Sequence, residues 1–173
     1  MIAVQGPIAK ETVAPLVDDI DRSDEAFPHM SVREGHVGGV RSRLFRVSFT
    51  GEPGYEINVP ADYGADLWAK LIESGKEHGV TPYGTEAMHV LRAEKGFIIV
   101  GQETDGTVTP DDLGMSGLVS KTKPDFVGKR SLQRPDIVAS DRKQLVGLVT
   151  LDPEIVLHDG AQLVLDKEQS IPM

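Results

Sequence analysis

An abrupt change in hydrophobic periodicity constrains the fold of this chain more than any other feature. From Val37 to Val59 apolar and polar residues alternate, and the stretch Gly51 to Gly54 interrupts the alternation. A period of two predicts β-strands, and a short glycine-containing break between two such runs predicts a β-hairpin with a four-residue turn. The next segment, Ala61 to Gly79, returns to helical spacing, with Gly79 as the expected C-terminal cap. We therefore expect a strand hairpin followed directly by an amphipathic helix.

Two other segments have helical spacing. The first begins at Gly6-Pro7, because proline at the first helical position loses no hydrogen bond, and Pro15 should kink or shorten it. The second is predicted from Thr85 to Lys95, with Thr85 as the N-cap and Gly96 as the residue that ends it. The side chains expected to point inward from this second helix are Met88, Val90 and Leu91.

The C-terminal part is predicted to begin a separate domain. Residues 134–143 mix proline, serine and charge without periodicity, so we place a boundary there, between a region 1–139 and a region 140–173. The second region holds two strand-like runs, 144–151 and 161–165, with a turn at His158-Asp159-Gly160 between them. Two strands are too few to form a stable unit alone.

Composition excludes several classes of protein. The net charge is −9 with a pI near 5.0, which disfavours nucleic acid and anionic membrane surfaces as partners. The chain has no cysteine, so a disulfide framework, a thiolate nucleophile and a cysteine-based metal site are excluded. Its five histidines lack metal-ligand spacing, so we expect no metal site. No apolar run is long enough to span a bilayer and no signal peptide is apparent, which fits a cytoplasmic protein.

Two charged residues stand out from the local patterns. Glu56 alternates with Tyr55 and Ile57, which should face the core, so its carboxylate points to the opposite face of the hairpin. Arg92 lies on the predicted helix that ends at Gly96. Spacing alone does not decide whether these two residues are simply exposed to solvent or bind a ligand.

Six short motifs occur along nearly the whole chain. They are VQGP from Val4, FTGEPGYEINVP from Phe49, LWAKL from Leu67, GVTPYGTEAMHVLRAEKG from Gly79, TVTPDDLGM from Thr107 and KPDFVGKRSL from Lys123. Taken in order, they resemble the folate-binding aminomethyltransferase family typified by the glycine cleavage T protein. Within that family, Tyr83 to Met115 is most similar to the C-terminal region of the alpha subunits of heterotetrameric sarcosine oxidases.

This resemblance implies an α+β fold. A ferredoxin-like region would carry the hairpin within a cloverleaf of three subdomains around a folate channel, and the start of a C-terminal β-barrel would follow. Region 1–139 would be the folate-binding part and region 140–173 the beginning of the barrel. The resemblance also implies that the family's catalytic aspartate lies upstream, so this chain would be a fragment without a catalytic residue and inactive alone.

The resemblance assigns three folate-binding residues. Glu56 aligns with the carboxylate that grips the pterin ring, whose exocyclic amine and adjacent ring N–H suit a bidentate acceptor. Arg92 aligns with an arginine of the folate site. Phe49 stands at a site position where T proteins commonly have tyrosine, and Val100 likewise replaces a tyrosine. These losses favour the sarcosine oxidase branch over ammonia-releasing glycine cleavage.

The implied function is capture of a one-carbon unit. In the intact enzyme, oxidation of sarcosine yields an imine whose carbon tetrahydrofolate would take up as 5,10-methylenetetrahydrofolate. FAD, FMN and NAD would be bound by other parts of the heterotetramer and not by this chain, and the other sarcosine oxidase subunits would be its partners. Two alternatives remain: an aminomethyltransferase of the glycine cleavage system, and a non-enzymatic folate-binding module, although KGFIIVGQE from Lys95 lacks the cysteine of such modules.

Overall fold

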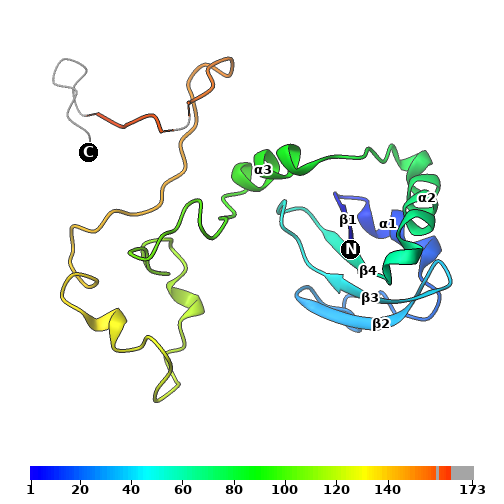
Figure 1. The fold of residues 1–173 in the computed structure, drawn as a ribbon, viewed down its shortest axis with the longest axis horizontal. Helices are drawn as coiled ribbons and strands as arrows, with labels where there is room; N and C mark the ends of the chain where they lie inside the picture. The colour runs from blue at the N-terminus through cyan, green and yellow to red at the C-terminus, as the bar shows by residue number, and fades with distance from the viewer. Residues whose placement is uncertain (159, 165–173) are drawn as a thin grey trace. The chain divides into compact units, whose positions relative to one another are not determined.

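The computed structural model of this protein describes residues 1–158 and 160–164. The chain forms two compact units, Met1–Asp105 and Gly106–Met173, and each is described by itself (Figure 1). The predicted division into 1–139 and 140–173 concerns domain assignment and stays a prediction.

The first unit is built on an antiparallel sheet of four strands. They are β1 (Ile2–Gln5), β2 (Ser31–Val37), β3 (Val40–Arg46) and β4 (Gly54–Asn58), in the order β1-β4-β3-β2 (Figure 1). The predicted hairpin is confirmed as β3 and β4, paired with Leu44 opposite Ile57 and Phe45 opposite Glu56. The ladder ends earlier than expected, so the connection is longer than the predicted four-residue turn.

Two helices, α1 and α2, cover one face of this sheet. Helix α1 (Ala9–Val13) continues into a 3-10 turn at Ala14–Leu16, which confirms that Pro15 shortens it. Helix α2 (Gly64–Gly75) is flanked by 3-10 turns at Ala61–Tyr63 and Lys76–His78. The turn at Lys76–His78 ends at the predicted cap, Gly79, whose positive φ of 70° is one that glycine adopts without strain.

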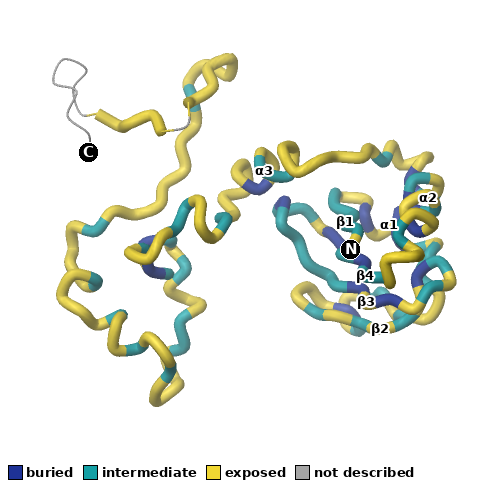
Figure 2. The backbone as a smooth tube through the Cα atoms, viewed as in Figure 1, coloured by how far each residue is buried: buried dark blue, intermediate teal, exposed yellow. Residues whose placement is uncertain are grey.

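The apolar core lies between these helices and the sheet (Figure 2). Its nine buried apolar residues come from α1, the segment before β2, three of the strands and α2, and all precede residue 72. They are Ala9, Val13, Phe27, Val37, Leu44, Tyr55, Ile57, Leu67 and Leu71.

Helix α3 (Thr85–Glu94) follows an extended segment and differs from its prediction in two ways. Its N-cap is Gly84 and not Thr85, and no side chain caps it. Val90 and Leu91, expected to point inward, are 58% and 38% exposed, whereas the buried residue of this helix is Arg92. The helix is therefore held by polar contacts and not by an apolar stripe.

The second unit has little regular structure among its described residues. It contains 3-10 turns at Ser116–Leu118 and Ser131–Gln133, and residues 144–151 form no strand. Part of the predicted second run and turn, Leu165 and Asp159, lies outside the described residues.

The α+β class with an antiparallel sheet is confirmed by the first unit. In the described part of the chain, no helix combines the length and apolar character needed to cross a membrane.

Buried polar groups organise the second unit. The carboxylate of Asp112 accepts hydrogen bonds from Thr109 N (2.8 Å) and Oγ1 (2.9 Å), and from Arg142 Nε (2.8 Å) and Nη2. Arg142 also donates to the Thr107 carbonyl at 2.8 Å, and Leu145 N donates to the Asp112 carbonyl at 2.8 Å. The bonds of Arg142 and Leu145 join residues thirty or more positions apart without an apolar core.

Candidate folate site on the open face of the sheet

The sheet face away from α1 and α2 carries the first predicted site residue, Glu56. Its neighbours on either side, Tyr55 and Ile57, are buried in the core, so Glu56 points to the opposite face as the alternation predicted. The register places it between Ala3 on β1 and Phe45 on β3. Glu56 is half-buried. A carboxylate beside a methyl group and a phenyl ring is a polar group on an otherwise apolar row of the sheet.

The next row on the same face is polar. Arg43 lies opposite Asn58 on β4 and opposite Glu34 on β2. Glu34 is exposed and lies 3.5 Å from Arg41, measured from Oε2 to Nη2. The face therefore offers two carboxylates in different surroundings, one half-buried at Glu56 and one solvated at Glu34.

Tyr83 is a residue that the sequence reasoning missed. Burial and the nearby charge of Glu56 together raise the pKa of the Tyr83 phenol, so the ring lies within electrostatic reach of the carboxylate. The phenol stays neutral and can donate a hydrogen bond. Tyr83 belongs to the extended segment between α2 and α3, whose irregular pattern carries no periodic signal that could have marked it.

A cavity of about 630 Å³ lies at the free edge of β1. It is bounded by β1, the start of α1, Trp68 and Ile72 of α2, and the segment His78–Thr85. Tyr83 lines it, whereas Glu56, Arg92 and Phe49 do not. The predicted site residues therefore lie outside this cavity, and Tyr83 links it electrostatically to Glu56.

Arg92 is enclosed by the segment that follows its own helix. Its Nη1 donates to Glu103 Oε1 at 2.5 Å and to the Phe97 carbonyl at 3.1 Å, and its Nη2 donates to Gln102 Oε1 at 2.8 Å. The other carboxylate oxygen of Glu103 accepts from Ile99 N at 2.7 Å. Burial raises the pKa of Glu103, but the bonds from Ile99 and Arg92 outweigh it and lower that pKa below its ordinary value.

The structure does not pair Arg92 with Glu56. Among the described residues, the bonds of the Arg92 guanidinium go to the Phe97–Glu103 segment, and Arg92 Nε is buried without a partner. The third predicted residue, Phe49, is half-buried in the β3–β4 connection. That connection meets the end of α3, because Lys95 Nζ lies 2.6 Å from Glu52 Oε1.

Gly51 permits this approach. It has a φ of 79°, and a Cβ at this position would collide with the Lys95 side chain. The structure thus brings the segment of Phe49 and the helix of Arg92 together, and it leaves Glu56 on the strand beyond them.

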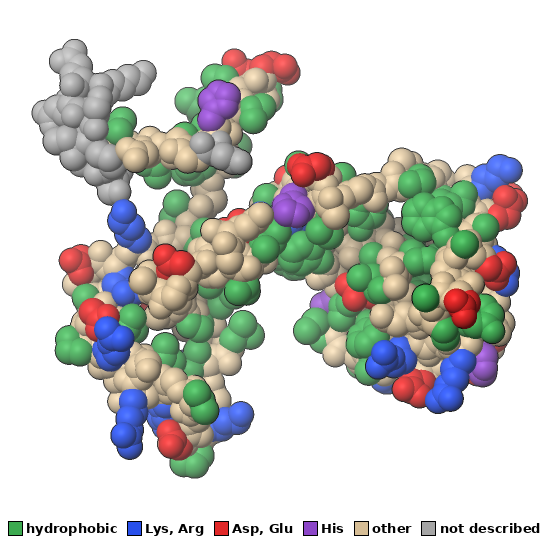
Figure 3. All heavy atoms as spheres, in the orientation of Figure 1, with side chains coloured by type: hydrophobic (Ala, Val, Ile, Leu, Met, Phe, Trp, Pro, Cys, Tyr) green, Lys and Arg blue, Asp and Glu red, His purple; other side chains and the backbone are tan. Residues whose placement is uncertain are grey.

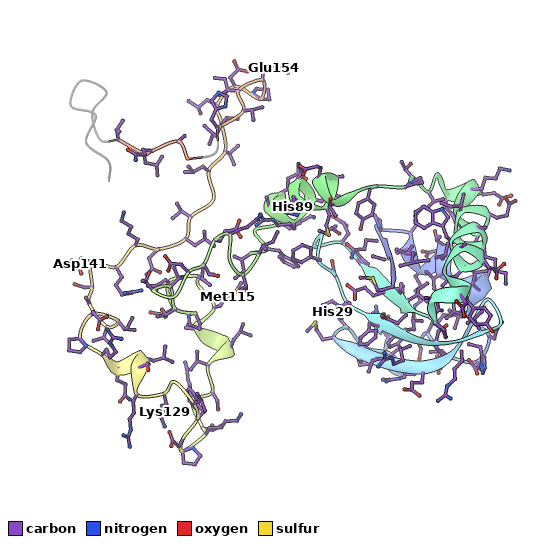
Figure 4. The ribbon with its side chains drawn as sticks, in the orientation of Figure 1. His29, His89, Met115, Lys129, Asp141 and Glu154 are labelled. Atoms are coloured by element: carbon purple, nitrogen blue, oxygen red, sulfur yellow. The ribbon has the colours of Figure 1, made fainter. Side chains whose placement is uncertain are left out.

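Metal-ligating groups do not cluster in the described part of the chain: no three His, Asp or Glu side chains lie close enough to hold an ion. Two of the histidines, His29 and His89, are marked in Figure 4 and belong to different segments, the loop before β2 and helix α3.

Comparison with known proteins identifies the family of this chain. The family model of the GCVT N-terminal domain matches residues 1–123. The chain belongs to this family. It is 51% identical over 166 residues to the sarcosine oxidase subunit alpha of Corynebacterium sp. (strain P-1), covering 95% of this chain and 17% of that protein. Identity to the Rhizobium meliloti (strain 1021) sarcosine oxidase subunit alpha is 46% over 165 residues, covering 94% and 16%.

A second group of relatives is more distant. The aminomethyltransferase of Thermosynechococcus vestitus (strain NIES-2133 / IAM M-273 / BP-1) is 38% identical over 169 residues, covering 95% of this chain and 44% of that protein. The chain thus spans about a sixth of the sarcosine oxidase alpha subunits and less than half of the aminomethyltransferase. These comparisons confirm the family that the ordered motifs indicated.

Proposed function

We propose that this chain is part of a sarcosine oxidase alpha subunit and contributes to the site where tetrahydrofolate captures the one-carbon unit from sarcosine. The observation that carries this proposal is Glu56, a half-buried carboxylate on the open face of a GCVT-family sheet. The higher identity to sarcosine oxidase alpha subunits, 51% against 38% for an aminomethyltransferase, supports the oxidase branch.

Glu56 has the chemistry that a pterin requires. A carboxylate accepts two parallel hydrogen bonds, and the pterin presents two parallel donors, the exocyclic amine and a ring N–H. Each charge-assisted bond contributes about 1.5 to 3 kcal/mol. Ala3 and Phe45 on either side of Glu56 give an apolar surface on which a flat ring can lie. The neutral phenol of Tyr83 adds a donor within electrostatic reach.

The main catalytic contribution of such a site is proximity. Reduced folate supplies the nucleophilic amine, and a residue set that holds it close to the newly formed imine favours capture over release of formaldehyde. In this proposal FAD, FMN and NAD are bound by other parts of a cytoplasmic, multi-subunit enzyme. The finer fold, a ferredoxin-like region within a three-part cloverleaf followed by the start of a β-barrel at 140–173, belongs to the same proposal.

The partition of products tests this function in the complete enzyme. We expect Glu56→Gln to leave the rate of sarcosine oxidation unchanged but to shift the product from 5,10-methylenetetrahydrofolate toward formaldehyde at limiting folate. Glu34→Gln on the same sheet face is the matched control and should leave the partition unchanged, because Glu34 is already solvated. An unchanged partition in the Glu56 variant would contradict the proposal.

An aminomethyltransferase of the glycine cleavage system is the second candidate, because an aminomethyltransferase is also 38% identical over 95% of this chain. The two functions differ in whether oxidation accompanies transfer. Oxygen consumption with sarcosine by the complete protein supports the oxidase, whereas ammonia release from an aminomethylated lipoyl carrier without oxygen uptake supports the transferase.

A further inference from the structure

The segment after α3 holds the side chain of Arg92 by hydrogen bonds. Both terminal nitrogens of the guanidinium are engaged, Nη1 by Glu103 and Nη2 by Gln102 at 2.8 Å. The side chain of Arg92 is 9% exposed and that of Glu103 is 26% exposed. A planar guanidinium held at two corners has a fixed third edge.

That third edge carries an unpaired donor. Arg92 Nε is buried and has no hydrogen-bond partner among the described residues. Buried N–H groups are almost always paired, so an orphan donor on a side chain that is otherwise fully bonded points to a partner from outside the described residues. Since an N–H can only donate, the missing group is an acceptor, such as a carbonyl or carboxylate oxygen.

A second orphan group lies on a segment that meets this helix. Ser48 Oγ, in the β3–β4 connection, is also buried without a partner. Glu52 and Gly51 of the same connection contact Lys95, three residues after Arg92. The connection that carries Ser48 and the helix that carries Arg92 therefore meet, and each holds a buried polar atom that lacks a partner.

We propose that Glu103, supported by Gln102, is a positioning residue that orients Arg92 so that its Nε–H donates to an acceptor oxygen of the reduced folate. This inference rests on the proposed folate function and deepens it. Glu103 does not touch the ligand. It acts through Arg92, and its second oxygen on Ile99 N holds the carboxylate in place.

A double-mutant cycle measured on ligand affinity tests this role. Folinate, a stable reduced folate, is titrated calorimetrically into the full-length protein carrying Glu103→Ala, Arg92→Ala or both. We expect Glu103→Ala to weaken binding about tenfold when Arg92 is present and less than about twofold when Arg92 is alanine. If Glu103 acts only through Ile99, Glu103→Ala should weaken folinate binding equally with and without Arg92, and that result would overturn the proposal. Unchanged binding by Glu103→Ala would overturn it as well.

Two further variants keep the result interpretable. Glu103→Gln preserves size but offers one acceptor oxygen where two are needed, so it should weaken folinate binding even if Glu103→Ala fails to fold. Glu94→Ala, an exposed carboxylate of α3, should bind like the wild type. If wild-type protein does not bind folinate, both proposals fail. If Glu56→Gln weakens binding and the Glu103 variants do not, the positioning role alone fails.

Discussion

The two units of this chain are stabilised by different kinds of interaction. Met1–Asp105 buries nine apolar residues between a sheet and two helices. In the described part of Gly106–Met173, the buried residues are Thr109 and Asp112, both polar, while apolar side chains such as Val127 and Leu151 are fully exposed. Figure 3 shows apolar side chains on the surface of the second unit. The comparison teaches that one unit depends on apolar burial and the other on a carboxylate-centred network.

The largest expected effect follows from removing core volume in the first unit. Leu67→Ala in α2, where the side chain is fully buried, should lower the free energy of unfolding by about 2 to 5 kcal/mol. Urea unfolding followed by circular dichroism measures this loss. Glu73→Ala, an exposed neighbour on the same helix, should change stability by less than about 0.5 kcal/mol. An equal loss from both variants would contradict the claim that apolar burial stabilises the first unit.

The second unit should respond to loss of its central charge pair. Arg142→Ala removes the donors that join Asp112 to residues thirty positions away and leaves a buried carboxylate with fewer partners. We expect limited proteolysis within residues 107–145 to accelerate roughly tenfold or more, because cleavage follows the population of the open form. Cleavage within Met1–Asp105 should be unchanged. Arg134→Ala, whose pair with Asp136 is exposed, is the matched control.

Acid should distinguish the two units by the same logic. Hydrogen bonds from Arg142 and Thr109 hold the pKa of Asp112 well below its ordinary value of 3.8. Since the folded pKa is lower than the unfolded one, the contribution of Asp112 to stability is complete above about pH 4 and is lost as the pH falls through the folded pKa. Amide hydrogen exchange, corrected for the intrinsic dependence of exchange on pH, should show protection across residues 107–145 falling only below that pH. A fall in this protection already near pH 6 would contradict the assignment to Asp112.

The smallest expected effect concerns the exposed ion pair between Lys95 and Glu52. Both side chains are substantially solvated, at 46% and 34% exposed. Exposed pairs contribute little and are screened by salt, so Lys95→Met should lower the melting temperature by no more than about 2 to 4 °C. The difference from wild type should disappear at 1 M salt. A larger, salt-insensitive drop would show that the junction is maintained by packing rather than by charge.

Periodicity predicted the parts of the fold whose stability comes from local apolar patterns. The β3–β4 hairpin, the shortening of α1 at Pro15 and the cap at Gly79 followed from spacing and backbone preferences. Strands β1 and β2 were missed. Strand β1 has four residues, and β2 presents polar residues such as Glu34 and His36 on its open side, so its apolar alternation is weak.

The site was less predictable because its contacts are not local. The apolar pattern of α3 pointed to Val90 and Leu91, but the buried residue is Arg92, whose carboxylate partner is eleven positions further along the chain. The electrostatic influence of Glu56 on Tyr83 depends on an irregular segment for which no pattern exists. By contrast, the orientation of Glu56 followed from alternation alone, since only the pleat of one strand decides it.

Direct binding of folinate to the full-length protein tests the central claim that Glu56 holds the pterin. Calorimetric titration of the wild type and of Glu56→Gln isolates one charge-assisted acceptor, with Glu34→Gln as the control on the same face. The account predicts saturable binding that Glu56→Gln weakens about tenfold or more and that Glu34→Gln leaves unchanged. Equal affinity in the wild type and the Glu56 variant would contradict it.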